Sequence, residues 1–340
     1  IISGLVGSEM CIRDRFKPRD AKLFKQRNAL GNTGGQYYVA GNPTFGAVFT
    51  YHLKDAPETI KSKRKKAEAS LNKDSKDIPF PGYESLTEEM REKPATLLLS
   101  INDSEGNLIR NVNKRALKGS GRIAWDLKHK SYYTITARSG WRESTGPFVT
   151  PGKYYATLYM KKDGELEKLD GPIEFGVKLL REGVLKGASF EEYNSHASDL
   201  ATVYKEYSVY SDTFSRLQSK LNLLEKALMV TESLNENMFT ELEKVKDEYL
   251  KLKDRYGTNP AKNEIGEWDK PTIGSRLSIA SQGLSTFYGP TEMNKYNLEL
   301  SKKLVNDYKT DVELINSKVE DLEKKIKELN HPHISGSGIN

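Results

Sequence analysis

The spacing of apolar residues after Gly187 constrains the fold of this chain more than any other feature of its sequence. Apolar side chains recur there every three or four residues in three runs, 200–228, 238–256 and 308–329, with charged residues at most positions between them. Each run predicts a helix with one apolar face. Three such faces bury one another best in an antiparallel helical bundle or coiled-coil hairpin. The stretch 257–290, which contains Gly and Pro, is predicted to hold a short helix over 273–284.

Before Gly187 the apolar residues alternate, which is typical of strands with one buried face. Alternation, or enrichment in β-branched and aromatic residues, predicts strands over 45–53, 95–101, 108–112, 121–127, 151–160 and 173–180. Turn residues separate these segments, and no helical period intervenes among the later ones. We therefore predict an α+β multidomain chain in which an antiparallel Ig- or fibronectin-III-like β-sandwich precedes the helical bundle.

The string LVGSEMCIRDR at residues 5–15 resembles the translation of a sequencing-library adapter. We therefore predict that residues 1–15 are an artefact without ordered structure and exclude them from the fold. Cys11, the single cysteine, would then not belong to the natural protein. We also expect that protein to extend upstream of this chain.

The remaining residues divide into four segments by composition and period. Residues 16–43 are rich in Gly, Asn and basic residues and are predicted to be a linker. Residues 44–182 hold the predicted sandwich, with a very polar insertion over 58–93. Residues 188–330 hold the predicted bundle, and residues 331–340 form a polar tail that we expect to be flexible.

The composition argues against several classes of protein. The 340 residues include 53 Lys and Arg against 47 Asp and Glu, together with five His and one Cys. One cysteine cannot form an internal disulfide, and five scattered histidines give no tetrahedral zinc pattern. The apolar runs are only a few residues long, so no membrane-spanning helix is predicted. We therefore disfavour a metalloenzyme, a thiol enzyme and an integral membrane protein, and we predict no cofactor.

The run KSKRKK at 61–66 is a basic cluster of the kind that can mark a nucleic-acid site. However, residues 54–93 contain ten Lys or Arg and nine Asp or Glu, so the charges of this segment largely cancel. No aromatic residues are interleaved with the lysines to stack on bases. We therefore predict a solvated insertion and no nucleic-acid partner.

Aromatic residues are concentrated in the predicted sandwich: Tyr132, Tyr133, Trp141, Phe148, Tyr154 and Tyr155. A sugar-binding platform would need several of these side chains exposed on one face. Alternation instead places Tyr154 and Tyr155 on opposite faces, and such residues more often fill the core of a small β domain. Carbohydrate binding is thus a minority hypothesis.

Paired carboxylates can hydrolyse glycosides, and three neighbouring groups occur: Glu88 with Glu89, Asp311 with Glu313, and Glu320 with Asp321. They lie in polar runs or on exposed helix faces, where nothing would raise a carboxyl pKa. His331 and His333 lie in the tail, and the turn at 103–107 has the wrong ligand spacing for calcium. No Gly-rich phosphate loop or serine-nucleophile elbow occurs. We therefore predict no catalytic, cofactor-binding or metal-binding residue.

Several segments resemble one family. The string FGAVFTYHLKDAP at 45–57 resembles a segment that follows the β-propeller in sortilin-like (VPS10/BNR-repeat) secreted bacterial proteins, which are often described as glycosyl hydrolases. The strings at 121–127 and 146–154 resemble the same family and also the Ig-like domain of flagellar hook caps. Residues 270–277 and 280–288 resemble the inter-helix segment of the family's helical tail. Together the resemblance covers about residues 16 to 330.

The resemblance implies a secreted, periplasmic or cell-surface protein whose β-propeller lies upstream and holds any hydrolase activity. It implies that this chain is a non-catalytic accessory or scaffolding C-terminal region. Its partners would be that propeller and a protein or polysaccharide at the cell surface. Two alternatives stay open: an auxiliary region of a glycoside hydrolase, and a carbohydrate- or protein-binding module. An exposed helical seam would bind a partner and give oligomers in solution.

Overall fold

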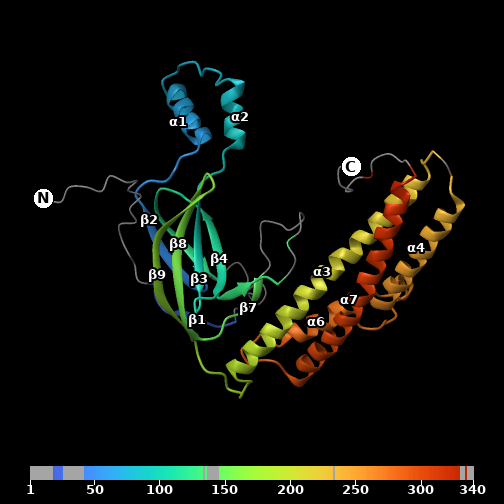
Figure 1. Ribbon diagram of the computed structural model, residues 1–340. Helices are drawn as coiled ribbons and strands as arrows, with labels where there is room; N and C mark the ends of the chain where they lie inside the picture. Colours follow the sequence, from blue (N-terminus) through green and yellow to red (C-terminus); the bar gives the residue numbers. More distant parts are fainter. Residues whose placement is uncertain are drawn as a thin grey trace. The chain divides into compact units, whose positions relative to one another are not determined.

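The computed structural model describes residues 18–25, 42–132, 135, 145–232, 234–329 and 334. These residues fall into two compact units. The first holds the described residues up to Lys130 and those of Thr145–Glu182, and the second holds those of Ser131–Ser144 and those from Gly183 onward. The first unit contains the strands, and the second is helical (Figure 1). None of the helices in the described ranges is both long and apolar enough to cross a membrane. The predicted artefact and most of the predicted linker and tail lie outside these ranges.

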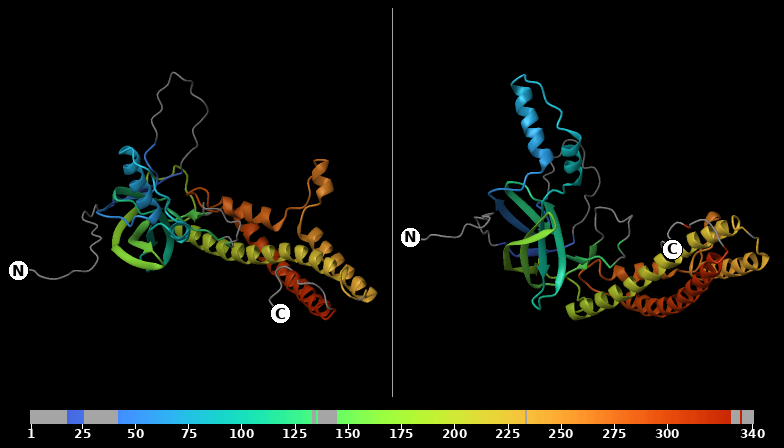
Figure 2. Two further views of the ribbon diagram at one scale, coloured as in Figure 1. Left: turned by 90° about the horizontal axis from the view of Figure 1, so that it is seen from above. Right: turned by 45° about the horizontal axis from the view of Figure 1, so that its top comes forward.

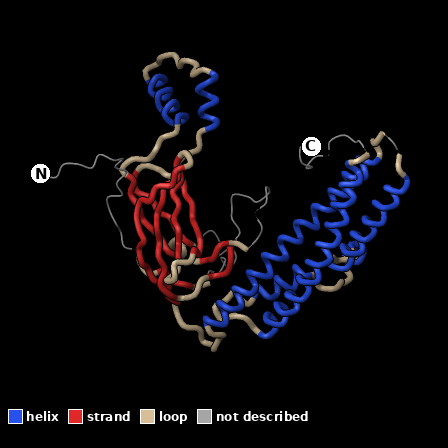
Figure 3. Tube along the Cα trace, in the orientation of Figure 1, coloured by secondary structure: helices blue, strands red, loops and turns tan. Residues whose placement is uncertain are grey.

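The first unit is built on a five-stranded sheet with the order β1-β9-β8-β3-β4. Its strands are β1 (Ala21–Leu23), β3 (Thr96–Asn102), β4 (Leu108–Arg115), β8 (Gly152–Lys162) and β9 (Glu165–Leu179). β1 runs parallel to β9, and the other neighbours are antiparallel, so the sheet is mixed. The sheet curls into a half-barrel, as the strand trace of Figure 3 shows. Burial along β3 alternates residue by residue, as the period of two predicts.

The remaining described strands form two ribbons of two strands each. β2 (Ala47–Leu53) pairs with β5 (Gly119–Trp125), and β6 (Lys128–Lys130) pairs with β7 (Thr145–Phe148). The fully buried Trp125 ring joins the first ribbon to the sheet, because its centroid lies 5.5 Å from that of Tyr154 on β8. This contact places the core of the unit between the β2–β5 ribbon and the five-stranded sheet.

A glycine is required where the chain enters β2. Gly46 has a φ of 98°, which L side chains rarely adopt. A Cβ at this position would lie 1.9 Å from the carbonyl oxygen of Trp125. The close approach of the two backbones therefore excludes any side chain here.

The predicted Ig-like β-sandwich is wrong. A sandwich consists of two facing antiparallel sheets, whereas the described strands form one mixed sheet of five strands and two ribbons of two strands each. β1 lies in the segment predicted to be a linker, and it adds a parallel strand to the edge of β9. Alternation of apolar residues shows which side chains face the core. It does not show which strands are neighbours, because pairing depends on contacts distant in sequence.

Between β2 and β3 the chain forms two helices where only a polar insertion was predicted. They are α1 (Ile60–Lys73) and α2 (Tyr83–Arg91), and Figure 2 shows them side by side. We call residues 54–94 the helical arm. No residue of either helix is buried. The helices are joined by Arg64, whose Nε and Nη2 donate to the carboxylate of Glu89 at 2.6 and 2.9 Å. The Ile60 nitrogen of α1 also donates to Glu92 Oε2, just after α2, at 2.6 Å. The arm is thus held together by polar contacts and lacks an apolar core.

The second unit contains three long helices that share one core: α3 (Phe190–Leu228), α4 (Glu236–Tyr256) and α7 (Glu292–Lys327). α3 and α7 run parallel, since their cross-helix partners stay 103 residues apart along their length. α4 runs antiparallel to α7, since their partners move in opposite directions along the chain. With a rise of about 1.5 Å per residue, α3 is about 58 Å long.

The third position of the bundle, antiparallel to α3 and α7, is filled by two helices in succession. α4 covers the half near the end of α3, and α6 (Ile273–Gln282) covers the half near its start. The short helix α5 (Pro260–Glu264) lies in the stretch between them. α6 buries Ile273, Leu277 and Ala280 in the same core. The single core therefore continues past the break between α4 and α6.

Candidate functional site

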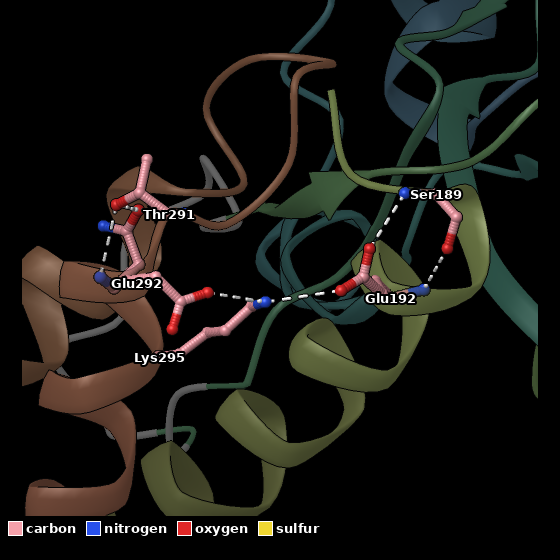
Figure 4. Close-up of polar contacts among 6 residues, drawn as sticks. Ser189, Glu192, Thr291, Glu292 and Lys295 are labelled. Atoms are coloured by element: carbon pink, nitrogen blue, oxygen red, sulfur yellow. Dashed lines mark hydrogen bonds and ion pairs between the residues drawn. The ribbon is translucent and has the colours of Figure 1, made fainter. Parts of the chain in front are cut away.

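The starts of α3 and α7 lie side by side and are joined by polar side chains (Figure 4). Glu192 N donates to Ser189 Oγ, and Ser189 N donates to Glu192 Oε2, each at 3.1 Å, which makes a capping box. Lys295 of α7 bridges the helices, with Nζ 3.3 Å from Glu192 and 3.1 Å from Glu292. These contacts fix the register of α3 against α7.

The electrostatics of this end follow from the parallel arrangement. Two helix N-termini, each with a partial positive charge, lie next to each other, and Glu192 and Glu292 offset that charge. The pKa of Glu192 lies below its ordinary value, first because Ser189 N donates to its carboxylate and then because of Lys295. Our sequence interpretation missed these residues. The spacing Ser-x-x-Glu directly before an apolar run is the signal that identifies them.

Charged and polar side chains continue the pairing along the flanks of the three helices. The further α3–α7 pairs are 103 positions apart: Lys302 with Asp199, Tyr210 with Glu313, and Lys220 with Glu323. The α4–α7 pairs advance by seven residues on both helices: Arg255 with Asp311, Lys318 with Glu248, and Lys325 with Glu241. Such pairs beside an apolar seam are typical of coiled coils, where they fix orientation and register.

An aromatic cluster fills the break between α4 and α6. Between ring centroids, Tyr256 at the end of α4 lies 4.8 Å from Tyr308, and Tyr308 lies 6.0 Å from Tyr207. Phe214 stacks on Tyr249 at 4.5 Å. The rings fill the space between the end of α4 and the start of α6, where neither helix packs against α3 and α7. They keep the apolar core continuous.

The hydroxyl groups of this cluster are poorly suited to proton transfer. Burial raises the pKa of Tyr308 and of Tyr256 above the ordinary tyrosine value, so both stay protonated at neutral pH. Tyr256 Oη donates to Asp311 at 2.6 Å, and Asp311 also pairs with Arg255 at 2.8 Å. The cluster therefore contributes packing and hydrogen bonds between helices.

Buried polar side chains position α6 against its neighbours. Asn294 Nδ2 donates to the Ile279 carbonyl at 2.6 Å, and Arg276 donates to Asn297 Oδ1 at 3.3 Å. His196 Nε2 lies 3.0 Å from a further carbonyl of α6. Because a buried polar group is costly without a partner, these bonds favour one placement of the short helix.

Ser301 continues the polar part of the α7 seam and has no such partner. Its side chain is fully buried, and its Oγ has no hydrogen-bond partner among the described residues. Ser301 lies on the buried face of α7 between the buried apolar residues Leu298 and Val305. Its effect on stability is therefore a cost that other contacts of the core offset.

The predicted aromatic residues do not share one exposed face where they are described. Tyr154 is buried, its Oη donates to the Thr150 carbonyl at 2.7 Å, and burial raises its pKa to about 12. Tyr155 points to the other face and donates to Glu174 at 3.1 Å. Tyr132 and Phe148 are half-buried, and Tyr133 and Trp141 lie outside the described residues. The opposite placement of Tyr154 and Tyr155 agrees with the alternation of the strand.

The neighbouring carboxylates point to different partners. Glu89 accepts from Arg64 of α1, whereas Glu88 is exposed. Asp311 faces α4, and Glu313 accepts from a tyrosine of α3, so these two carboxylates diverge around α7. In the third group, Glu320 accepts from Asn316 of its own helix and Asp321 pairs with Lys324. No pair is arranged across a common substrate position.

The turn that resembles a calcium loop is closed by its own side chain. Asp103 Oδ1 accepts from the backbone nitrogens of Glu105 and Asn107 at 2.9 and 2.8 Å. His331 and His333 lie outside the described residues. Within the described ranges, no group of three or more His, Cys, Asp or Glu side chains could hold a metal ion. A surface depression on α4 is lined by side chains of that helix alone: Phe239, Thr240, Glu243, Lys244 and Asp247.

Comparison with protein-family models gave no match, and comparison with curated proteins gave none either.

Proposed function

We propose that this chain is a non-catalytic scaffolding region that supports a β-propeller domain of the same secreted or cell-envelope protein. The observation that carries the proposal is the pairing of α3 with α7 along their length, with α4 and α6 packed on successive halves of that pair. Caps, cross-helix ion pairs and buried amides all serve to hold one register. This arrangement suits a helical body that keeps a fixed length and shape.

The chemistry of the polar groups supports the same proposal. A catalytic site needs polar groups that converge on one position with perturbed pKa values. Here the cross-helix pairs are distributed along the flanks, and the shifted tyrosines are raised by burial among aromatic rings. The upstream propeller and the location outside the cytoplasm are inferred from the family resemblance, and we include both in the proposal.

The test uses the protein expressed from its complete gene. Leu242→Ala removes a fully buried side chain of α4, and Leu250→Ala, at a half-exposed position of the same helix, is the matched control. If the helical unit is a scaffold, only the first change lowers the thermal midpoint or the folded yield of the upstream domain. Unchanged upstream stability with a higher KM for a glycoside would contradict scaffolding and favour an auxiliary region of a hydrolase.

A further inference from the structure

The helical arm carries an exposed apolar stripe on α2. Tyr83 and Met90 are 81% and 87% exposed, and Phe80, just before the helix, is 63% exposed. The rings of Phe80 and Tyr83 lie 5.1 Å apart between centroids, so the stripe continues past the start of α2. Large apolar side chains with this exposure commonly mark a contact surface when they are grouped.

The helical positions give this face a definite pattern. Successive residues lie about 100° apart around a helix axis, so Tyr83, Thr87 and Met90 share an arc of about 60°. Glu84 and Arg91 lie together along one edge of that arc, seven residues apart. Both are exposed, and within the described residues neither side chain has an ion pair. The face therefore has an apolar edge and an edge with one acid and one base.

This pattern is complementary to itself. When two identical helices pack antiparallel about a two-fold axis, the same edge of each helix meets, and residue order is reversed. An axis at Thr87 brings Glu84 to within one residue, about 1.5 Å along the helix, of the position opposite Arg91 of the second copy, twice. The same axis brings Tyr83 equally close to Met90 of the second copy, and a thioether beside an aromatic ring is a favourable contact. Glu88 lies about 100° from Thr87 and so falls outside the contact.

We propose that the exposed face of α2 is a self-association surface, on which α2 of a second copy packs antiparallel about a two-fold axis at Thr87. The surface on one nine-residue helix is small. It falls well below the total of about 1,200 Å² that stable dimers bury. The association is therefore weak in dilute solution and becomes important where copies are concentrated. This inference does not depend on the proposed scaffolding function.

Disulfide cross-linking tests the position of the axis directly. Cys11 is first replaced by serine, and Thr87→Cys is then introduced on the proposed axis, where the two copies of one residue approach each other. Ser70→Cys, at an exposed position of α1, is the matched control. We expect the Thr87→Cys chain to form a covalent dimer at least about tenfold faster. Equal rates for the two variants would overturn the proposal.

Charge exchange tests the antiparallel pairing. Added to the Thr87→Cys chain, Glu84→Arg or Arg91→Glu alone places like charges opposite each other twice, and each should slow cross-linking about tenfold. The double variant Glu84→Arg/Arg91→Glu restores opposite charges and should restore the rate. Because both positions are exposed, circular dichroism should show unchanged folding in all three. A double variant as slow as the single ones would contradict the proposed geometry.

A lipid surface is the other occupant that an exposed apolar stripe beside a basic helix could suit. Flotation with phosphatidylserine vesicles distinguishes the two. Met90→Ser should slow cross-linking through position 87, and the unaltered chain should not float with vesicles. Flotation that Met90→Ser abolishes, together with no preference for cross-linking at position 87, would overturn self-association and assign the stripe to lipid.

Discussion

The helical arm and the helical unit are both rich in charged residues, but they use those charges differently. In α3, α4 and α7, ion pairs flank a continuous apolar core. In α1 and α2, no residue is buried, and polar contacts link the helices: the pair of Arg64 with Glu89 and the bond from Ile60 N to Glu92. Ion pairs therefore reinforce an apolar core in the helical unit, whereas in the helical arm they join two helices that have no apolar core between them.

The largest expected difference follows from removing one apolar side chain in each region. Leu242→Ala deletes a fully buried group and should lower the free energy of unfolding of the helical unit by about 3 kcal/mol. Leu86→Ala, on the partly exposed side of α2 that faces α1, should cost less than about 1 kcal/mol. Hydrogen exchange of the slowest amides in α7 and in α2 measures each effect. Equal losses would contradict the distinction between the two regions.

The pH dependence should separate the two regions next. Hydrogen bonds from Arg64 hold the pKa of Glu89 below its ordinary value. A carboxyl whose pKa is lower in the folded state stabilises that state above its unfolded pKa of about 4.3, and the contribution is lost as the pH falls through the folded value. Protection of α1 and α2 amides should therefore fall as the pH drops below about 5, before that of α3 and α7.

Substitution of Glu89 by glutamine should reproduce this acid effect at neutral pH. The exposed carboxylate of Glu84 is the matched control, and Glu84→Gln should leave amide protection in the arm unchanged. Arm helices that keep full protection in Glu89→Gln would show that another interaction holds them together.

A smaller effect of opposite sign is expected inside the helical unit. Ser301→Ala removes a fully buried hydroxyl that lacks a partner among the described residues, and it should raise the free energy of unfolding by about 1 kcal/mol. Ser281→Ala, where an exposed hydroxyl donates to the Ser278 carbonyl, should change it little. Urea unfolding measures both variants. Destabilisation by Ser301→Ala would mean that the hydroxyl contributes to the core.

The smallest effect is expected from one flank ion pair. Lys246 lies 2.8 Å from Glu225 of α3 and is only partly accessible, so Lys246→Met should cost less than about 1 kcal/mol. In about 1 M salt the difference from the unaltered protein should become smaller still. Lys244→Met, on the exposed side of α4, provides the control. A loss of unfolding free energy as large as that of Leu242→Ala would mean that the flank ion pairs stabilise the helical unit as strongly as its buried apolar residues do.

Periodicity predicted the elements whose apolar residues repeat, and it missed those without a repeat. The short helix predicted over 273–284 is α6 at Ile273–Gln282, and the strand predicted over 121–127 overlaps β5 at Gly119–Trp125. α1 has no apolar stripe for a core, so its sequence reads as a polar insertion. β1 has three residues, too few to show alternation.

Arrangement was harder to predict than the elements themselves. The mixed sheet depends on pairing between β1 and β9, which lie more than 150 residues apart. The polar network at the starts of α3 and α7 depends on the parallel register of two helices separated by α4, α5 and α6. No local pattern encodes such an offset. Only the caps, Ser189 with Glu192 and Thr291 with Asn294, leave a signal within a few residues.

The parallel pairing of β1 with β9 has a mechanical consequence. Tension applied to the chain before Ala21 and after Leu179 pulls the two strands along their length in opposite directions. The ladder then resists in shear, so that its hydrogen bonds share the load and do not open one at a time. The Leu180 nitrogen, which donates to the Leu23 carbonyl at 3.0 Å, and the pair of Lys178 with Asp20 add to that resistance. Force passing from residues before β1 to the helical unit would thus be borne by the β1–β9 hydrogen bonds at the edge of the sheet.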